Sequence, residues 1–398
     1  MAEAERPAAE GKLPPVVKAL GGVSLLNDLA SEMVYPLLPA FVTRGLGGGA
    51  LALGALDGIA DAVSAVVKIA AGWLGERRAW RRPLIVAGYA LAAATRPLMG
   101  LSAAAWQVVA LRAADRIGKG ARNPPRDTVI ADAVDGGQRG RAFGFQRAMD
   151  HAGAMIGPLV ATALMALLAW TPRRVIIWSA VPGVVAVLVA VLALRRAPTH
   201  AAPEPPPAAT PMPAGAPPAP LVGLILLFAL TRLPETLFLL RLQERGVPVA
   251  VIPVVWALLH VVRSASSYPG GRLADRIGPA RMMLGGWAVY AVVCVGLALT
   301  VSPVAAGAWL LGYGLVAAAT ESPERMFVAA WGGRATRGRR FGLYHAGVGL
   351  AALPGGLALG ALYEWRGGTA ALLASGAAGG LLALAGLAMA RPPRRAAV

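Results

Sequence analysis

Several ionisable side chains of this sequence stand inside long apolar segments, where a charge must be shielded from lipid by protein or water. Asp28 and Glu32 are four residues apart in an apolar stretch at about residues 17–42. At this spacing two carboxylates share one helix face and repel each other. One interpretation is that one of these carboxylates exchanges a proton for a cation or a solute as access to it changes. A permanent pair with an arginine is the alternative, and the sequence favours neither.

A second set of polar side chains forms one stripe in the next apolar stretch. Asp57, Asp61, Ser64 and Lys68 follow each other at i, i+4, i+7 and i+11. A charge in the middle of a membrane helix costs at least roughly 2.5 kcal/mol, even on lenient scales, so the stripe is expected to face protein or water. Lys68 is expected to pair with an acid on a neighbouring helix. Asp61 is the candidate for substrate or proton contact, because Asp57 lies nearer the expected outer surface.

The fourth apolar stretch contains a possible ion pair near its middle. Arg112 is followed by Asp115 at i+3 and by Arg116 at i+4. A buried guanidinium group needs an acidic partner, which Asp115 or an acid of the first two stretches can supply. The pattern predicts either a proton relay or substrate contact in a central cavity, or an ion pair that locks helices together.

The fifth stretch combines an acid with small residues. Asp150 and His151 are adjacent, so they point about 100° apart on a helix, and Asp150 is the cavity candidate. Gly153 and Gly157 allow a neighbouring helix to approach closely, and Pro158 bends or relaxes the helix.

The second half of the chain offers fewer acids in apolar surroundings. The residues that can reach a cavity there are Arg232, Glu235, His260, Arg263, Glu321 and His345. Of these, Glu235 is the candidate for a cavity acid. Although His, Asp and Glu are metal ligands, none of their spacings is diagnostic, so we expect no metal site and no cofactor.

The segments that carry these residues identify an integral membrane protein. The chain has 398 residues, of which 57% are hydrophobic, and its mean hydropathy is +0.60. Such a composition is far too apolar for a soluble domain of this size. Twelve apolar stretches, each long enough to span a bilayer as a helix, occur at about residues 17–42, 50–74, 82–102, 104–123, 142–169, 173–194, 220–242, 249–271, 281–301, 304–330, 341–363 and 368–390. The fold class is therefore all-α, with twelve transmembrane helices.

The formal net charge of +18 indicates membrane topology rather than nucleic-acid binding. The connections after even-numbered stretches, together with the C-terminal tail, hold most of the cations. The other side holds few, chiefly Arg44, Arg173, Arg174, Arg241, Arg245 and Arg366. Because the cation-rich side of a membrane protein is cytoplasmic, we expect both termini inside.

A sequence repeat divides the chain into halves. Pro125-Arg126-Asp127 followed by Arg139 to Gly144 matches Pro323-Glu324-Arg325 followed by Arg337 to Gly342, 198 residues later. The repeat predicts two bundles of six helices that rock about a central site. We place an N-terminal tail at residues 1–16, the bundles at 17–196 and 220–390, a Pro- and Ala-rich linker at 197–219, and a basic tail at 391–398.

Several motifs resemble those of the major facilitator superfamily over essentially the whole chain. Gly271 to Gly278 matches its loop signature Gly-x-Leu-Ala-Asp-Arg-x-Gly, and Gly72 to Arg77 is an imperfect copy in which Glu76 replaces the aspartate. Arg112 and Gly118 resemble its intramembrane arginine motif. The run from Gly153 to Pro158 resembles the motif of proton-coupled exporters. Segments around Asn27 to Pro36 and Asp115 to Asp127 resemble a bacterial subgroup.

The resemblance implies a role for the two loops. A carboxylate among arginines at a helix end can cap a neighbouring helix and favour one packing of the bundles. Ordinary surface ion pairs are the alternative. The expected latch residues are Gly72, Glu76, Arg77, Gly271, Asp275, Arg276 and Gly278.

Together these observations predict a monomeric secondary transporter of the bacterial inner membrane. It would move a small solute by alternating access, coupled to protons, and the exporter-like motif favours efflux. The alternatives are an importer of a metal ion, metal chelate or organic solute, and a membrane sensor that does not transport. No enzyme activity is expected, because no nucleophile, base and orienting group occur together, and no ATP-binding loop is found.

Overall fold

The computed structural model describes residues 13–134, 139–195, 219–330 and 337–389, and these residues form helices without strands. Side chains are not described at 139–140, 219, 322, 325–330 and 337–342. The N-terminal half contains α1 (Pro15–Val34), η1 (Tyr35–Leu37), α2 (Leu38–Ala40), η2 (Phe41–Gly45), α3 (Ala50–Glu76), α4 (Arg78–Leu101), α5 (Ala105–Asp132), α6 (Arg139–Leu168), α7 (Pro172–Trp178) and α8 (Ala180–Arg195). The C-terminal half contains α9 (Ala219–Thr231), α10 (Glu235–Glu244), α11 (Ile252–Ile277), α12 (Pro279–Leu299), α13 (Pro303–Ala330) and α14 (Arg337–Met389).

These elements correspond to the twelve predicted membrane crossings. Gly367, with φ +83°, divides α14 into two successive helices, and the first, sixth and seventh crossings each consist of two or more shorter elements. Eight helices in the described ranges are long and apolar enough to cross a membrane. The helices α1, α5 and α11 fall outside that set, and these three carry Glu32, Arg112, Asp115 and Arg263. The predicted all-helical membrane fold is confirmed among the described residues.

Prolines make two crossings less regular than the apolar pattern predicts. The first crossing passes through 3-10 and π turns between Tyr35 and Gly45, around Pro36 and Pro39. The seventh is interrupted between Thr231 and Glu235, because Pro234 cannot donate the backbone hydrogen bond that would continue the helix. We expected one helix over 220–242, so this break is a correction to the sequence prediction.

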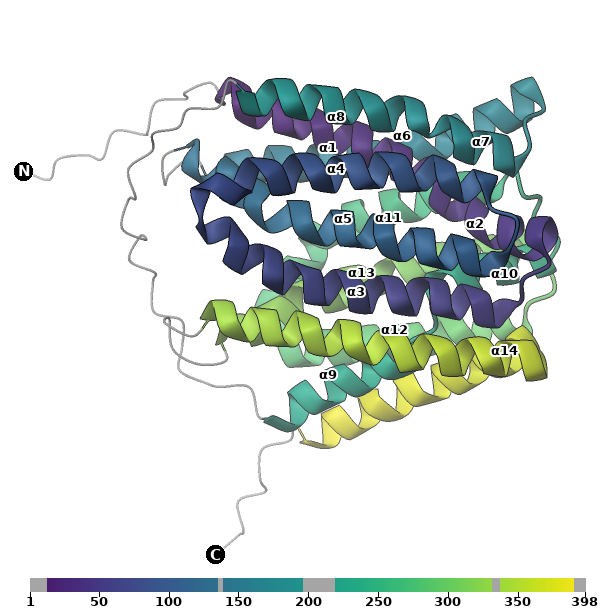
Figure 1. Ribbon diagram of the computed structural model, residues 1–398. Helices are drawn as coiled ribbons and strands as arrows, with labels where there is room; N and C mark the ends of the chain where they lie inside the picture. Colours follow the sequence, from purple (N-terminus) through teal and green to yellow (C-terminus); the bar gives the residue numbers. More distant parts are fainter. Residues whose placement is uncertain (1–12, 135–138, 196–218, 331–336, 390–398) are drawn as a thin grey trace, which may run out of the picture.

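The helices form two groups that meet along two helix pairs. Within the first half, α1 packs on α6 and α8, while α5 packs on α3 and α4; within the second, α12 and α14 pack together and α11 packs on α13. Between the halves, α3 packs along α14 and α6 packs on α11. The start of α1 and the end of α14 lie at the same end of the molecule (Figure 1). The expected linker and terminal tails fall almost entirely outside the described residues.

Glycines allow the closest helix contacts. A Cβ atom added at Gly54 would lie 2.1 Å from the backbone oxygen of Gly356, so α3 and α14 meet backbone to backbone. At Gly153 and Gly157 an added Cβ would lie 2.4 Å from the Leu25 oxygen and 2.5 Å from the Leu29 oxygen, respectively. The small residues of α6 therefore contact α1, and this contact holds Asp28 and Glu32 against the rest of the first bundle.

The α1–α6 contact leads to a stability prediction. Gly157→Ala is expected to destabilise the protein by about 1–3 kcal/mol, because backbone atoms of α1 must move to admit the new methyl group. Thermal unfolding of the purified protein in detergent measures the effect. Gly144→Ala in the same helix is the matched control, since an added Cβ there meets no atom within 4 Å. The control should be neutral or stabilising by up to about 1 kcal/mol. Equal unfolding temperatures for the two variants would contradict the assigned contact.

Candidate functional site

A cavity of about 280 Å³ lies between the two halves of the molecule. Its walls come from α1, η1, α3 and α5 of the first half and from α9, α10, α11 and α14 of the second, together with the segment between α9 and α10. The wall is unusually rich in charge for the middle of a membrane protein. Its ionisable side chains, apart from Tyr35, are Glu32, Asp57, Asp61, Glu235, Arg116, Arg232, Arg263 and His260.

The break between α9 and α10 borders this cavity, and its backbone groups have specific partners. The Leu233 amide donates hydrogen bonds to the hydroxyl oxygens of Tyr290, at 2.8 Å, and Ser375, at 3.1 Å. The Ser375 hydroxyl in turn donates to the Thr231 carbonyl, at 2.6 Å. A membrane protein tolerates irregular backbone only where such partners exist. Side chains of the second half therefore stabilise the break, which places Arg232 and Glu235 at the cavity.

Asp57 of the first half accepts hydrogen bonds at the start of α10, in the second half. Its carboxylate accepts hydrogen bonds from the Thr236 amide at 3.1 Å and the Thr236 hydroxyl at 2.8 Å. The Tyr35 hydroxyl donates to the same carboxylate at 3.1 Å. A carboxylate is the preferred partner for free amides at a helix N-terminus. Asp57 thus connects the two halves, although we expected it to lie too near the outer surface to serve the cavity.

Glu32 also contacts the other half, but through weakly polar groups. The Trp256 indole donates to its carboxylate at 2.8 Å, and His260 Nε2 is 3.9 Å away. The Trp256 ring packs against the rings of Tyr35 and His260, with both centroid distances 5.2 Å. Within the described part of the chain, no arginine or lysine nitrogen lies within 4.0 Å of Glu32. Its charge is therefore not neutralised by a direct partner.

Glu235 has a direct cationic partner. Arg263 of α11 forms an ion pair with it at 2.5 Å, and the Tyr313 hydroxyl is 3.4 Å from the same oxygen. The Arg263 guanidinium group also lies over the rings of Trp256 and Tyr313, at 5.6 and 5.3 Å from their centroids. The acid that we expected in the C-terminal half thus lines the cavity but is already paired.

Three further charges of the cavity lack a direct partner in the described ranges. Asp61, Arg116 and Arg232 take part in no hydrogen bond or ion pair within 4.0 Å there. All three line the cavity. Asp61 and Arg232 are exposed and Arg116 is half-buried, so water or a solute in the cavity can reach each of these charges.

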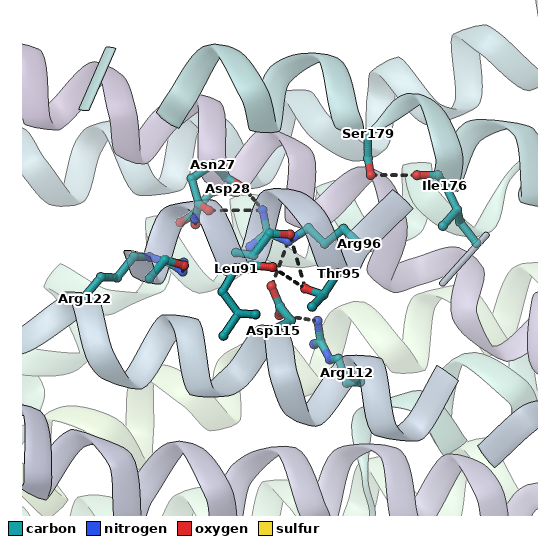
Figure 2. A network of polar contacts seen from close by, with 12 residues as sticks. Asn27, Asp28, Leu91, Thr95, Arg96, Arg112, Asp115, Arg122, Ile176 and Ser179 are labelled. Carbon is teal, nitrogen blue, oxygen red and sulfur yellow. Dashed lines mark hydrogen bonds and ion pairs between the residues drawn. The ribbon is translucent and has the colours of Figure 1, made fainter. Parts of the chain in front are cut away.

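Arg112 and Asp115 lie outside this cavity, in a buried network of the first bundle (Figure 2). Arg96 of α4 binds Asp115 at 2.9 Å, and Arg112 binds the other carboxylate oxygen at 3.3 Å. Arg96 also donates to the backbone and side-chain oxygens of Asn27, at 2.9 and 3.1 Å. Asp115 is fully buried. The network ties α1, α4 and α5 together, and Arg112 reaches the cavity only indirectly, over the Tyr35 ring at 4.7 Å.

Asp150 borders a second cavity of about 280 Å³, within the first half. Gln146 donates to its carboxylate at 3.1 Å, and His151 borders the same cavity. Asp28 does not line the central cavity; it accepts a hydrogen bond from Asn27 at 2.9 Å, and its charge acts on Asp150. The structure therefore separates Asp28 from Glu32 and places Asp28 against α6, where a Cβ atom added at Gly153 would lie 3.1 Å from the Asp28 Cβ.

The expected latch residues lie at the ends of α3 and α11. The side chains of Glu76, Arg77, Asp275 and Arg276 are exposed. Gly278 has φ +89°, a conformation that favours glycine and starts the turn into α12.

A different acid pairs with an arginine near the first of these loops. Arg81 donates to the Gly75 carbonyl at 2.7 Å and binds Asp132 at 2.6 Å, which joins the ends of α3, α4 and α5. Neither Glu76 nor Asp275 has such a contact among the residues described.

Among the described residues, hydrogen bonds between the halves concentrate away from the end that holds the start of α1 and the end of α14. Besides Asp57 and Glu32, the Leu51 amide donates to Glu364 at 3.0 Å, and the Thr162 hydroxyl donates to the Ala250 carbonyl at 3.0 Å. Leu51 lies at the start of α3, and Thr162 lies near the end of α6. Both positions are remote from the start of α1, so these contacts join the halves at the far end of the molecule.

Sequence reasoning missed Arg96 and Trp256 and gave little weight to Asp57. Arg96 is a single arginine in an apolar stretch, next to Pro97, and this isolation was the available signal. A charge that would face lipid has to find a partner, and the partner is on the next helix. Trp256 carries no comparable signal, because an aromatic side chain in an apolar stretch is ordinary.

Comparison with known proteins agrees with this architecture. The sequence matches the Major Facilitator Superfamily over residues 20–321 and 261–398. An uncharacterized MFS-type transporter of Methanocaldococcus jannaschii is 28% identical over 361 residues, which cover 88% of each chain. The multidrug resistance protein MdtH of Yersinia pestis is 27% identical over 172 residues, or 41% of this chain and 43% of MdtH.

Solved structures share the fold at low sequence identity. A bacterial homolog of the human lysosomal transporter Spinster, in an inward-facing and unoccupied conformation, has a TM-score of 0.71 and 17% identity. The match covers 95% of this chain and 96% of the homolog. The nucleoside transporter NupG has a TM-score of 0.74 and 12% identity, and the match covers 95% of this chain and 100% of NupG. With the family match spanning nearly the whole sequence, the chain belongs to the major facilitator superfamily.

Proposed function

We propose that the protein is a secondary active transporter that moves a small solute by alternating access, coupled to protons, in the direction of efflux. The observation that carries this proposal is the charged cavity between the halves, with walls from both bundles and a broken helix at its edge. Discontinuous helices near the membrane midplane form the binding sites of many secondary transporters. Rocking of the bundles would then change the side from which this cavity is reached.

Glu32 is the proton-coupling acid in this proposal, with Asp61 as its neighbour in the same cavity. Glu235 and Asp115 are bound by arginines at 2.5 and 2.9 Å, so each of them already has a cationic partner. Glu32 instead has an indole donor and a histidine at 3.9 Å. A carboxylate without a direct cationic partner can gain and lose a proton as water reaches it. Its contacts to Trp256 and His260 also cross the bundle interface, so they would respond to rocking.

Efflux is supported by two likenesses. The run from Gly153 to Pro158 resembles the exporter motif, and MdtH, with which the chain shares a partial match, is named a multidrug resistance protein. If the termini are cytoplasmic, as the distribution of arginines predicts, the contacts of Leu51, Asp57 and Thr162 close the outer side. The structure then corresponds to a state in which solute would enter the cavity from the cytoplasm.

Glu32→Gln is expected to uncouple transport from protons. In proteoliposomes, a solute that raises the unfolding temperature of the wild type would be driven by an imposed pH gradient, and the variant would lose about tenfold or more of that rate. Exchange of solute for solute should remain within about twofold, because it needs no net proton movement. Glu244→Gln is the control, since Glu244 pairs with Arg241 at 3.0 Å away from the cavity.

The same assay tests the proposal as a whole. In the efflux direction, a gradient with excess protons on the outer side should drive solute out of the cytoplasmic compartment. The opposite response would indicate an importer. If no solute moves in response to any proton gradient, coupled transport by this protein is wrong.

A further inference from the structure

We propose that the transported solute is a zwitterion, with its anionic group between Arg116 and Arg232 and its cationic group at Asp61 and Glu32. This inference rests on the proposed function, because it assigns a substrate class to the same cavity. It adds a division of the cavity into two subsites of opposite charge.

The anionic subsite follows from the two arginines that lack a direct partner. Arg116 belongs to α5, and Arg232 to the break between α9 and α10. Neither guanidinium group lies within 4.0 Å of a carboxylate in the described part of the chain, in contrast to Arg96, Arg112 and Arg263. Arg116 is half-buried and Arg232 is exposed, and both line the cavity, so a solute in the cavity can reach both guanidinium groups. Because a guanidinium group presents paired N–H donors, a carboxylate or a phosphonate is the group that it binds best.

The cationic subsite follows from the remaining acids. Asp57 is occupied by Tyr35 and Thr236, and Glu235 by Arg263. Asp61 has no direct partner among the described side chains, while the partners of Glu32 are Trp256 and the more distant His260. These two carboxylates are therefore available for an ammonium group, which could displace a proton from Glu32 as efflux coupling requires. The ring of Trp256 beside Glu32 also suits a cation.

The charge balance favours a solute with both groups. The cavity has four carboxylates, Glu32, Asp57, Asp61 and Glu235, against three arginines, which leaves one net negative charge with His260 neutral. A solute that is only an anion would add to this excess, whereas one that is only a cation would leave both free arginines unmatched. A zwitterion satisfies both subsites and does not change the net charge.

The volume of the cavity indicates a small solute. A space of about 280 Å³ lies just below the range of ordinary ligand pockets, which is about 300–1,000 Å³. With its polar walls, this space fits a compound of amino-acid size better than a large apolar drug.

The anionic subsite also couples binding to rocking. Arg116 belongs to the first bundle and Arg232 to the second. An anionic group that bridges them stabilises the arrangement in which both arginines face one cavity. A ligand shifts a conformational equilibrium only through such a difference in affinity between two states.

Matched probes test the two subsites separately. The purified protein in detergent is titrated with the proteinogenic amino acids, with the amines that lack their carboxylate, and with the acids that lack their amine; phenylalanine, 2-phenylethylamine and 3-phenylpropanoate form one such set. The increase in unfolding temperature gives the relative affinity. At least one amino acid is expected to bind about tenfold or more tightly than both the corresponding amine and the corresponding acid, since each of these analogues lacks one charge-assisted contact.

Equal binding of an amine or an acid and its parent amino acid would reject the corresponding subsite. If no amino acid binds while a solute of another class is driven by a proton gradient, the zwitterion assignment is wrong and the transport proposal stands. If nothing is driven, the transport proposal fails as well.

Arginine variants provide the second arm of the test. Arg116→Gln and Arg232→Gln should each reduce the preference for an amino acid over its amine to within about twofold, while binding of the amine is unchanged. Arg116→Lys, which retains the charge without the paired donors, should show an intermediate preference and guards against a folding defect. Arg174→Gln is the control, because Arg174 lies over the Trp170 ring and does not line the cavity. An unchanged preference in both glutamine variants would overturn the anionic subsite.

Discussion

Asp115→Ala is expected to destabilise the protein by about 3–5 kcal/mol, because it leaves two buried guanidinium groups without their shared carboxylate. Arg96 and Arg112 bind opposite oxygens of Asp115 at 2.9 and 3.3 Å, and all three side chains are at most 2% exposed. The only other hydrogen bonds that the described residues offer Arg96 are to Asn27. Thermal or denaturant unfolding of the purified protein measures the loss.

Asp132→Ala is the matched control for this experiment. Asp132 also binds an arginine, Arg81, at 2.6 Å, but its side chain is 42% exposed. Pairs that water can reach contribute about 0–1 kcal/mol, so this variant should unfold close to the wild type. Similar losses of stability in Asp115→Ala and Asp132→Ala would show that burial of the Asp115 network does not determine its contribution to the free energy of unfolding.

The second large effect concerns the contact that joins the halves at Asp57. Asp57→Ala removes two hydrogen bonds from Thr236 and one from Tyr35, each contributing about 1.5–3 kcal/mol to a charged acceptor. The far end of the molecule should therefore open more often. Alkylation of a cysteine at Ala50→Cys, in the Cys294→Ala background, reports this opening, since Ala50 is buried against α14. Its rate is expected to rise at least about tenfold.

Two further variants define the role of the charge. Asp57→Asn keeps an oxygen acceptor for Thr236 and should give an intermediate rate. Glu244→Ala removes an ion pair that stays within α10, so its rate should match the parent. An Asp57→Ala rate equal to the parent rate would mean that the glycine contacts of α3 and α14 close this end without Asp57.

Much of the fold could be predicted because its signals are local. Apolar length predicted the helices, and the repeat predicted two halves of the same order. The break at Arg232–Pro234 was not predicted, although Pro234 is visible in the sequence, because a proline inside a membrane helix is often accommodated by a bend. Here Tyr290, Ser375 and Asp57 accept or donate the hydrogen bonds that make a full break stable.

The candidate site could be predicted only in part. Spacing at i+4 placed Asp28 and Glu32 on one helix face, yet Glu32 contacts Trp256 in the other half while Asp28 lies against Gly153 of α6. One helix face spans neighbours on two sides, so a shared face does not imply a shared cavity. Arg112 required a buried partner, and several acids could have supplied it; the structure assigns Asp115 and adds Arg96 from α4.

By itself, the sequence determined the class of protein, its apolar segments, their order and the charges that could not face lipid. These properties depend on composition and on spacing along one helix. Only the tertiary structure decided which charges come together: Asp115 with two arginines, Glu235 with Arg263, and Asp61, Arg116 and Arg232 along the wall of one cavity. The reason is physical, since the rotation of each helix and the choice of its neighbours follow from packing between segments far apart in the chain.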